Sequence, residues 1–136
     1  MTLRGVGVDV VDLLRFRSLI DRRGQTLARR WFDTEELDQP GDRALNLARS
    51  FAVKEAVLKA LRPSAVHHPR WREIVAVGDG TSMSVRLSGL VKREADAWGV
   101  RSICVTTAVR DQILIATAIA EVAQTSGTSP SSTGLS

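Results

Sequence analysis

The amino-acid sequence predicts a single α+β domain followed by a short tail. Segments with strand-like alternation and segments with helical periodicity are mixed along the chain, and short turns between strands predict hairpins. The chain has 136 residues, of which 43% are hydrophobic and 25% are charged, as in ordinary globular domains. We assign residues 1–121 to the domain and expect residues 122–136, which are rich in Ser, Thr and Gly, to be disordered.

The N-terminal segment is expected to form a strand and two short helices. Residues 4–11 are rich in Val and Gly and favour a strand. Asp12 is the expected N-cap of a helix over 13–23, which Gly24 ends. A second short helix is expected over 25–32.

The longest helical pattern of the chain runs from Asp42 to Leu61. Its apolar residues keep a helical period, and Pro40-Gly41 separates it from the preceding DTEEL stretch (33–37), in which Asp33 or Thr34 is the expected cap. The remaining elements are predicted by turn residues and alternation. They are a loop over 62–70, a strand over 71–77, a turn over 78–82, a strand over 83–88, a helix over 89–98, and strands over 101–109 and 112–121.

Asp9 lies in the middle of the first predicted strand, where a charge is unexpected. It shares a strand face with Gly5, Gly7 and Val11. Burial of an ion costs several kcal/mol unless the ion is paired or binds a metal. Asp9 therefore caps a neighbouring helix, pairs with an arginine, or binds a cation for which the two glycines leave room.

Glu55 extends the apolar stripe of the long helix, and Lys59 follows one turn later. One interpretation is an i,i+4 ion pair on the helix surface. The other places Asp9 and Glu55 around a hard cation such as Mg²⁺, which favours one or two carboxylates together with substrate phosphates. Lys59 would then lie close to those phosphates.

Arginines are concentrated between residues 15 and 30, and the formal net charge of the chain is +4. They form either a solvated helix face or a landing site for an acidic protein, a phosphate-rich ligand or nucleic acid. No nucleic-acid-binding motif is recognisable, and no apolar run approaches the ~20 residues needed to span a bilayer. We expect neither nucleic acid nor membrane as a partner. The arginines are Arg15, Arg17, Arg22, Arg23, Arg29 and Arg30.

Several short motifs, in this order and spacing, resemble those of one family. GVGVDVVDLLRF (5–16) and FAVKEAVLKAL (51–61) are similar to the two signatures of holo-[acyl-carrier-protein] synthases, the small type of 4′-phosphopantetheinyl transferase. LARRWFDTEEL (27–37) resembles the segment between these signatures, and WREIVAV (71–77) and VTTAVRDQILIATAIAE (105–121) resemble the later strands of that family. The similarity covers about residues 4–121.

The resemblance implies a fold, an assembly and a reaction. The fold is a small antiparallel sheet packed with helices, assembled as a homotrimer with active sites between subunits. The reaction is the Mg²⁺-dependent transfer of the phosphopantetheine arm from coenzyme A to a serine of an acyl carrier protein. By motif position Asp9 and Glu55 match the metal-binding, catalytic carboxylates, and Lys59 matches the catalytic lysine close to the coenzyme A phosphates. Arg15 matches a carrier-protein contact.

Other site residues follow from neighbouring positions. We assign Arg22 and Arg23 to carrier-protein binding, and Arg49 and Ser50 to coenzyme A binding. The chain departs from the family pattern at Ser50, where an arginine is usual, in the 62–70 loop, where Gly-Thr-Gly is usual, and at Val109, where a polar residue is usual.

These departures leave open two functions. The chain is a phosphopantetheinyl transferase serving fatty acid or polyketide biosynthesis in the cytoplasm, or it is a homologue whose transferase activity has been lost or redirected. A metal-free module that binds carrier proteins without modifying them is a form of the second. The lone Cys104 is predicted to be a core residue, and His67-His68 lacks a spacing partner for metal binding.

Overall fold

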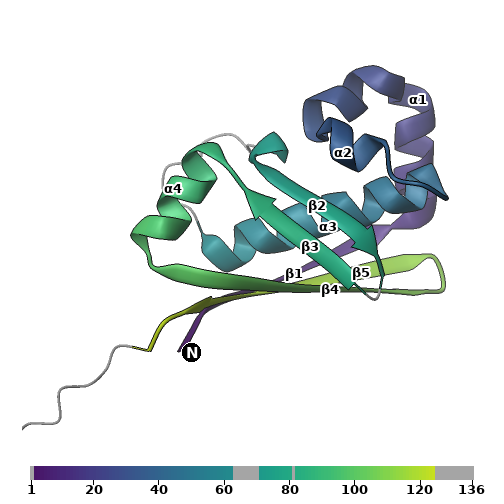
Figure 1. Ribbon diagram of the computed structural model, residues 1–136. Helices are drawn as coiled ribbons and strands as arrows, with labels where there is room; N and C mark the ends of the chain where they lie inside the picture. The colour runs from purple at the N-terminus through teal and green to yellow at the C-terminus, as the bar shows by residue number, and fades with distance from the viewer. Residues whose placement is uncertain (1, 63–70, 81, 125–136) are drawn as a thin grey trace, which may run out of the picture.

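The computed structural model describes residues 2–62, 71–80 and 82–124, and one long helix, α3 (Arg43–Leu61), lies at its centre. A three-stranded antiparallel sheet of order β1-β5-β4 covers one side of α3, and a β2-β3 hairpin covers another (Figure 1). The strands are β1 (Thr2–Asp12), β2 (Ile74–Asp79), β3 (Ser82–Leu87), β4 (Val100–Arg110) and β5 (Ile113–Val122). The other helical elements are α1 (Leu13–Trp31), α2 (Thr34–Leu37), a 3₁₀ turn η1 (Trp71–Glu73) and α4 (Gly89–Ala97).

The predicted break at Gly24 is a kink inside α1. Its φ of 59° and ψ of −149° are non-helical and suit glycine, which has no Cβ to clash. Helical geometry resumes after Gly24 and continues to Trp31, so the two predicted helices are the two halves of α1. Asp12 caps α1 as expected, because its Oδ1 accepts a hydrogen bond from the Arg15 backbone N–H at 3.1 Å.

The other predicted helix starts are confirmed, and one predicted strand starts later. Asp33 and Glu36 form a capping box on α2, and Asp42 caps α3 by accepting from the Leu45 backbone N–H at 3.2 Å. Residues 71–77 were expected to be a strand throughout. In the structure the first three residues of that stretch form η1, and the strand β2 begins at Ile74.

Helix α3 packs directly on the backbone of β1. A Cβ built on Gly5 would overlap the carbonyl oxygen of Ala60, and one built on Gly7 would overlap that of Ala56. The room left by these glycines is therefore filled by the backbone of α3, not by a ligand. Ala116, on β5, is the partner of Asp9 across the β1–β5 ladder and is fully buried beneath the same helix.

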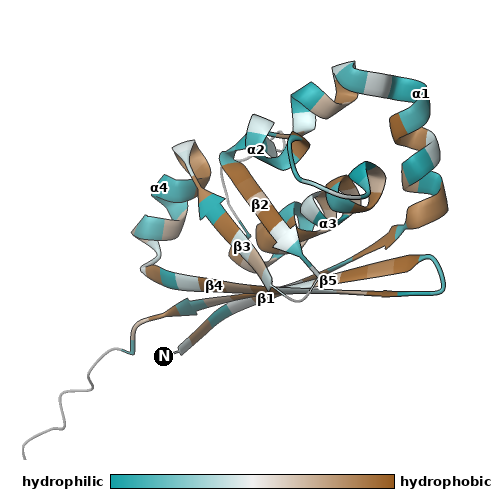
Figure 2. Cartoon of the chain, turned by 45° about the vertical axis from the view of Figure 1, so that its right-hand side comes forward, coloured by the Kyte–Doolittle hydropathy of each residue, from teal (hydrophilic) through white to brown (hydrophobic). Residues whose placement is uncertain are grey.

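The face of the three-stranded sheet that points away from α3 is apolar and exposed. Its large side chains include Val6, Val8, Val10, Ile115 and Ile119, which are 36–58% exposed. The hydrophobic colouring of these strands is visible in Figure 2, with no element drawn over that face. We refer to these five residues as the outer sheet face.

Cys104 corrects a sequence prediction. It was expected in the core because it alternates with an apolar residue, but it is exposed. Its partner across the β4–β5 ladder is Ile119, which belongs to the outer sheet face. Cys104 therefore lies on the side of the sheet that points away from α3. Apolar alternation identified the strand correctly, but the core-facing residues are Ile103 and Val105, and Cys104 lies on the opposite face.

Two predictions fall on segments outside the described residues. These are most of the 62–70 loop, including His67-His68, and most of the tail. Among the described residues, no helix has both the length and the apolarity that a membrane crossing requires.

Candidate active site

Asp9, Glu55 and Lys59 come together where β1 passes α3. The Asp9 side chain is only 15% exposed, whereas that of Lys59 is 53% exposed. Lys59 Nζ donates hydrogen bonds to Asp9 Oδ1 at 3.1 Å and to the Val8 carbonyl oxygen at 3.0 Å. Among the described residues, the partner of Asp9 is therefore a lysine on the long helix, and neither an arginine nor a helix N-terminus takes this place.

Glu55 is the second carboxylate of this group. Burial raises the pKa of Glu55, the negative charge of Asp9 raises it further, and Lys59 opposes both effects. Two carboxylates share one ammonium group, so negative charge is in excess at a half-buried position. Bringing a cation to this point would relieve the repulsion between Asp9 and Glu55.

The donor set fits a hard divalent cation. No group of three His, Cys, Asp or Glu side chains suited to a metal occurs among the described residues. Mg²⁺ does not need such a group, because it is commonly bound by one or two carboxylates, water and substrate phosphates. Asp9 and Glu55 supply the two carboxylates, and the exposed side of Lys59 leaves the approach open to an anionic ligand.

Arg49 lies on α3 near the end of the β2-β3 hairpin. Its Nε is buried and has no hydrogen-bond partner among the described residues, and the same is true of Oγ1 of Thr107 on β4. Both groups lie near Gly80, where a Cβ would be 3.4 Å from Arg49 Nη2 and 3.6 Å from Thr107 Oγ1. Polar atoms left unpaired at a buried position usually have an explanation, and here a bound anion or water would satisfy them.

Ser50 does not face this open region. It is completely buried, and its Oγ donates a hydrogen bond to the Ala76 carbonyl oxygen on β2 at 2.6 Å. The assignment of Ser50 to coenzyme A binding therefore has no support in the geometry. Sequence position placed it beside Arg49, but one residue step turns a side chain by about 100° around a helix. The two neighbours face different elements.

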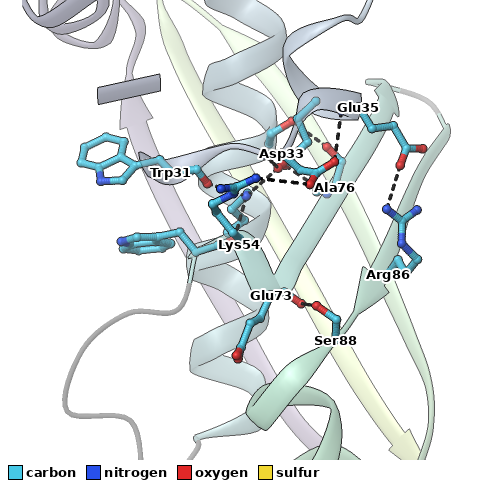
Figure 3. Close-up of polar contacts among 12 residues, drawn as sticks. Trp31, Asp33, Glu35, Lys54, Glu73, Ala76, Arg86 and Ser88 are labelled. Atoms are coloured by element: carbon cyan, nitrogen blue, oxygen red, sulfur yellow. Dashed lines mark hydrogen bonds and ion pairs between the residues drawn. The ribbon is translucent and has the colours of Figure 1, made fainter. Parts of the chain in front are cut away.

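A second lysine–carboxylate pair, Lys54 with Glu36, was missed by the sequence analysis. The side chains are fully buried and joined at 2.6 Å. Lys54 lies between Trp31 and Ala76 in Figure 3. Burial raises the pKa of Glu36 and lowers that of Lys54, while the contact between the two opposes both shifts. The sequence did contain a signal for this pair, because helical periodicity assigns the position of Lys54 to the core.

The arginines assigned to a partner are exposed on α1. Arg15, Arg22 and Arg23 are all accessible. Arg22 Nε donates to the Ser18 carbonyl oxygen at 3.3 Å, within the same helix. The apolar Leu14 beside them is 63% exposed, so α1 presents positive charge together with an apolar side chain.

Val109, the last departure noted in the sequence, lies near the end of β4. It is 45% exposed and pairs with Leu114 across the β4–β5 ladder. A valine side chain there neither accepts a proton nor binds a phosphate. The structure therefore leaves this position without a polar group.

Comparisons with known proteins agree on one family. The model of the 4′-phosphopantetheinyl transferase superfamily matches residues 5–118. The holo-[acyl-carrier-protein] synthase of Beutenbergia cavernae is 40% identical over 118 residues, which cover 86% of this chain and 97% of that protein. That of Micrococcus luteus is 41% identical over 98 residues, 71% of this chain and 74% of that protein. The crystal structure of the Neisseria meningitidis synthase has a TM-score of 0.77 at 25% identity and covers 88% of this chain and 99% of that one.

Proposed function

The chain belongs to the 4′-phosphopantetheinyl transferase superfamily, and from that membership we propose that it acts as a holo-[acyl-carrier-protein] synthase. In this reaction it transfers the 4′-phosphopantetheine arm of coenzyme A to a serine of an acyl carrier protein. The observation that carries the proposal is the convergence of Asp9, Glu55 and Lys59 at a half-buried, partly open position. The name of the relatives supplies the substrates, and this convergence supplies groups suited to them.

The chemistry is a phosphoryl transfer. The serine oxygen forms a bond to the β-phosphorus of coenzyme A, the bond from that phosphorus to the bridging oxygen breaks, and adenosine 3′,5′-bisphosphate leaves. The hydroxyl proton passes to a carboxylate of the site or to water. Such reactions depend mainly on positioning and on neutralisation of charge.

We assign the carboxylates Asp9 and Glu55 to Mg²⁺ and Lys59 to the diphosphate. Mg²⁺, when bound, neutralises charge on the phosphate oxygens. Lys59 Nζ already donates two hydrogen bonds, to Asp9 and Val8, and an ammonium group has three donors. One N–H therefore stays available for a phosphate oxygen, and the exposure of the side chain leaves it accessible.

We assign Arg49 to a phosphate group of coenzyme A. Support comes from its buried Nε, which has no partner among the described residues and lies beside Thr107 and Gly80. An anion at the accessible end of the guanidinium would order the whole side chain. Arg49 and Lys59 would thus contact different parts of one extended, negatively charged ligand.

Arg15, Arg22 and Arg23 are assigned to the acyl carrier protein. Their exposure on one helix, with Leu14 beside them, provides charge and apolar area for an acidic partner. Lys and Arg residues on such a surface act mainly on the rate of encounter and on orientation.

We infer a homotrimer with sites between subunits. The outer sheet face is the support, because its apolar side chains lie together and no element among the described residues covers them. Contiguous apolar surface of this kind usually marks an interface. We place the protein in the cytoplasm, where a single unpaired cysteine stays reduced, and assign the activity to residues 1–121 without the tail.

Intact-mass spectrometry of an apo carrier protein tests the proposal. The carrier is incubated with this protein, coenzyme A and Mg²⁺, and in parallel with EDTA in place of Mg²⁺. We expect added mass equal to one phosphopantetheine in the first reaction and none in the second. A folded protein that modifies none of several carrier proteins would refute the proposal.

That negative result would favour the second candidate, a homologue whose activity is lost or redirected. The observations in its favour are the burial of Ser50 and the apolar Val109, at positions where the family resemblance leads us to expect an arginine and a polar residue. A carrier protein that binds without gaining mass would identify it as a binding module.

A further inference from the structure

The outer edge of strand β2, on the side away from β3, is covered by side chains. The Ala76 backbone N–H donates to Glu36 Oε2 at 3.1 Å, and its carbonyl oxygen accepts from Ser50 Oγ at 2.6 Å. Two residues later, the Gly78 backbone N–H donates to Gln39 Oε1 at 3.0 Å. Backbone groups two residues apart point to the same edge of a strand, so these side chains take the place of a neighbouring strand.

Lys54 joins this edge to three further segments. Its Nζ donates to Glu36 Oε1 at 2.6 Å, to the Trp31 carbonyl oxygen at 2.7 Å and to the Trp71 carbonyl oxygen at 2.8 Å. The three N–H groups of an ammonium are thus all used. The end of α1, the start of α2, η1 and β2 are therefore held at one point of α3 (Figure 3).

Ser50 and Lys54 form one stripe of α3, and Glu55 and Lys59 form another. Each pair is spaced i,i+4, so its two members lie above one another on the helix. The stripes are about 100° apart around the axis. The first is bonded to the β2 edge, and the second faces Asp9. Because both stripes belong to one helix, the bonds of the first stripe to the β2 edge also set the rotation about the helix axis at which the second stripe faces Asp9.

The bonds between α3 and the β2 edge also set the position of the part of the hairpin that follows Ala76. Strand β2 continues from Ala76 to Asp79 and leads to Gly80, which abuts the Arg49 guanidinium. A shift of β2 along α3 would change the space around Arg49. Small displacements of binding groups are costly, since about 1 Å can change a rate by about 100-fold.

We propose that Ser50, Glu36 and Lys54 are positioning residues, which bond the β2 edge to α3 and so hold Arg49 and Glu55 in place for coenzyme A and the metal. Ser50 thus acts on coenzyme A through Ala76 and does not touch it. This inference rests on the proposed transferase function. It gives the serine that replaces the usual arginine a role other than ligand contact.

Ser50→Ala is the variant that tests the proposal, with Ser84→Ala as its matched control. Ser84 is also a serine that donates to a β2 carbonyl, that of Val77 at 3.4 Å, but it is exposed on β3. We expect Ser50→Ala to raise the KM for coenzyme A about tenfold, to leave the KM for carrier protein within about twofold, and to lower the melting temperature by about 3–6 °C. The control should match the wild type in all three.

Gln39→Ala is a second variant, because a partly exposed glutamine can be removed without leaving a buried charge. It removes the bond to the Gly78 N–H, and we expect the same selective rise in the KM for coenzyme A at smaller magnitude. A lower melting temperature with both KM values unchanged would overturn the proposal in favour of stability alone. A raised KM for coenzyme A at an unchanged melting temperature would overturn it in favour of direct contact.

Different results would refute the transferase function and the positioning role. A wild type that neither modifies a carrier nor binds coenzyme A refutes the proposed function, and the positioning role with it. An active wild type whose Ser50→Ala variant keeps the wild-type KM for coenzyme A refutes the positioning role alone.

Discussion

Lys54 and Lys59 lie on the same helix, and each contacts a carboxylate from another element. The Lys54–Glu36 pair is joined at 2.6 Å with both side chains fully buried. The Lys59–Asp9 pair is joined at 3.1 Å, with the lysine side chain 53% and the aspartate side chain 15% exposed. The first pair is closed, because every N–H of Lys54 has an acceptor in the protein. The second is open to a ligand.

The two pairs therefore suit different roles. The closed pair can hold elements of the fold together, and the open pair can bind a ligand. A buried, fully bonded ion pair costs desolvation and often adds little stability relative to apolar residues, so its use is specificity of arrangement. At the open pair, Glu55 adds a second negative charge that Lys59 alone does not offset. Because negative charge at the open pair is not fully neutralised, a cation and a phosphate can bind there favourably. The closed pair offers neither an unneutralised charge nor a free N–H for such ligands.

The largest effect is expected from Asp9→Asn at the open pair. The substitution keeps the shape of the side chain and removes one charge of the proposed metal site, so transfer should fall by at least about 100-fold, while the melting temperature stays close to that of the wild type. Asp12→Asn is the matched control, since asparagine caps a helix as well as aspartate does. Both are measured by carrier-protein intact mass, and wild-type activity of Asp9→Asn would remove the distinction between the pairs.

Lys54→Met tests the closed pair through stability. The change leaves the Glu36 carboxylate buried without its cation, and we expect the free energy of unfolding to fall by about 3–5 kcal/mol. Lys59→Met removes a partly exposed partner and should cost at most about 1 kcal/mol. Urea denaturation compares the two variants, and equal losses would show that burial does not distinguish them.

Arg15→Glu tests whether the exposed arginines of α1 bind the carrier protein. Reversal of charge on α1 should raise the KM for carrier protein about tenfold and leave the KM for coenzyme A unchanged, with the difference shrinking at high salt. Arg93→Glu, an exposed arginine on α4, is the control. If both KM values rise together in Arg15→Glu, the assignment of Arg15 to the carrier protein is wrong.

The smallest effect concerns Asp42, which caps α3 and bonds Arg17 at 2.7 Å. The hydrogen bond from Arg17 lowers the pKa of Asp42 below its usual value. A lowered carboxyl pKa contributes stability above the unfolded-state pKa of about 4, and this contribution is lost as pH falls through the folded-state pKa. The melting temperature of Asp42→Asn should therefore differ from that of the wild type by a small amount at neutral pH, and the difference should narrow in acid. A pH-independent difference would contradict this.

Local features could be predicted from the sequence. Asp12 was recognised as a cap, Asp33 as one of two candidate caps and Gly24 as a break, because each acts on backbone within a few residues of itself. The proximity of Asp9 and Glu55 was expected from the family motifs, since spacing alone left an ordinary surface ion pair as an alternative.

Long-range contacts could not be predicted. The burial of Ser50, its bond to Ala76 and the Lys54–Glu36 pair depend on where the hairpin lies against α3. The exposure of Cys104 depends on which face of the sheet meets α3, and Cys104 lies on the face opposite Ile103 and Val105, which pack against the core. In each case the residue type was known and its neighbour was not.

The Mg²⁺ dependence of transfer in Glu55→Gln tests the central claim most directly. Carrier-protein intact mass is followed as Mg²⁺ is titrated into metal-free wild type and variant, with circular dichroism as the measure of fold. We predict saturable, EDTA-reversible transfer by the wild type and none by Glu55→Gln at any Mg²⁺ concentration, with the variant at least as stable because repulsion from Asp9 is removed. Wild-type turnover by a folded Glu55→Gln variant would contradict the account.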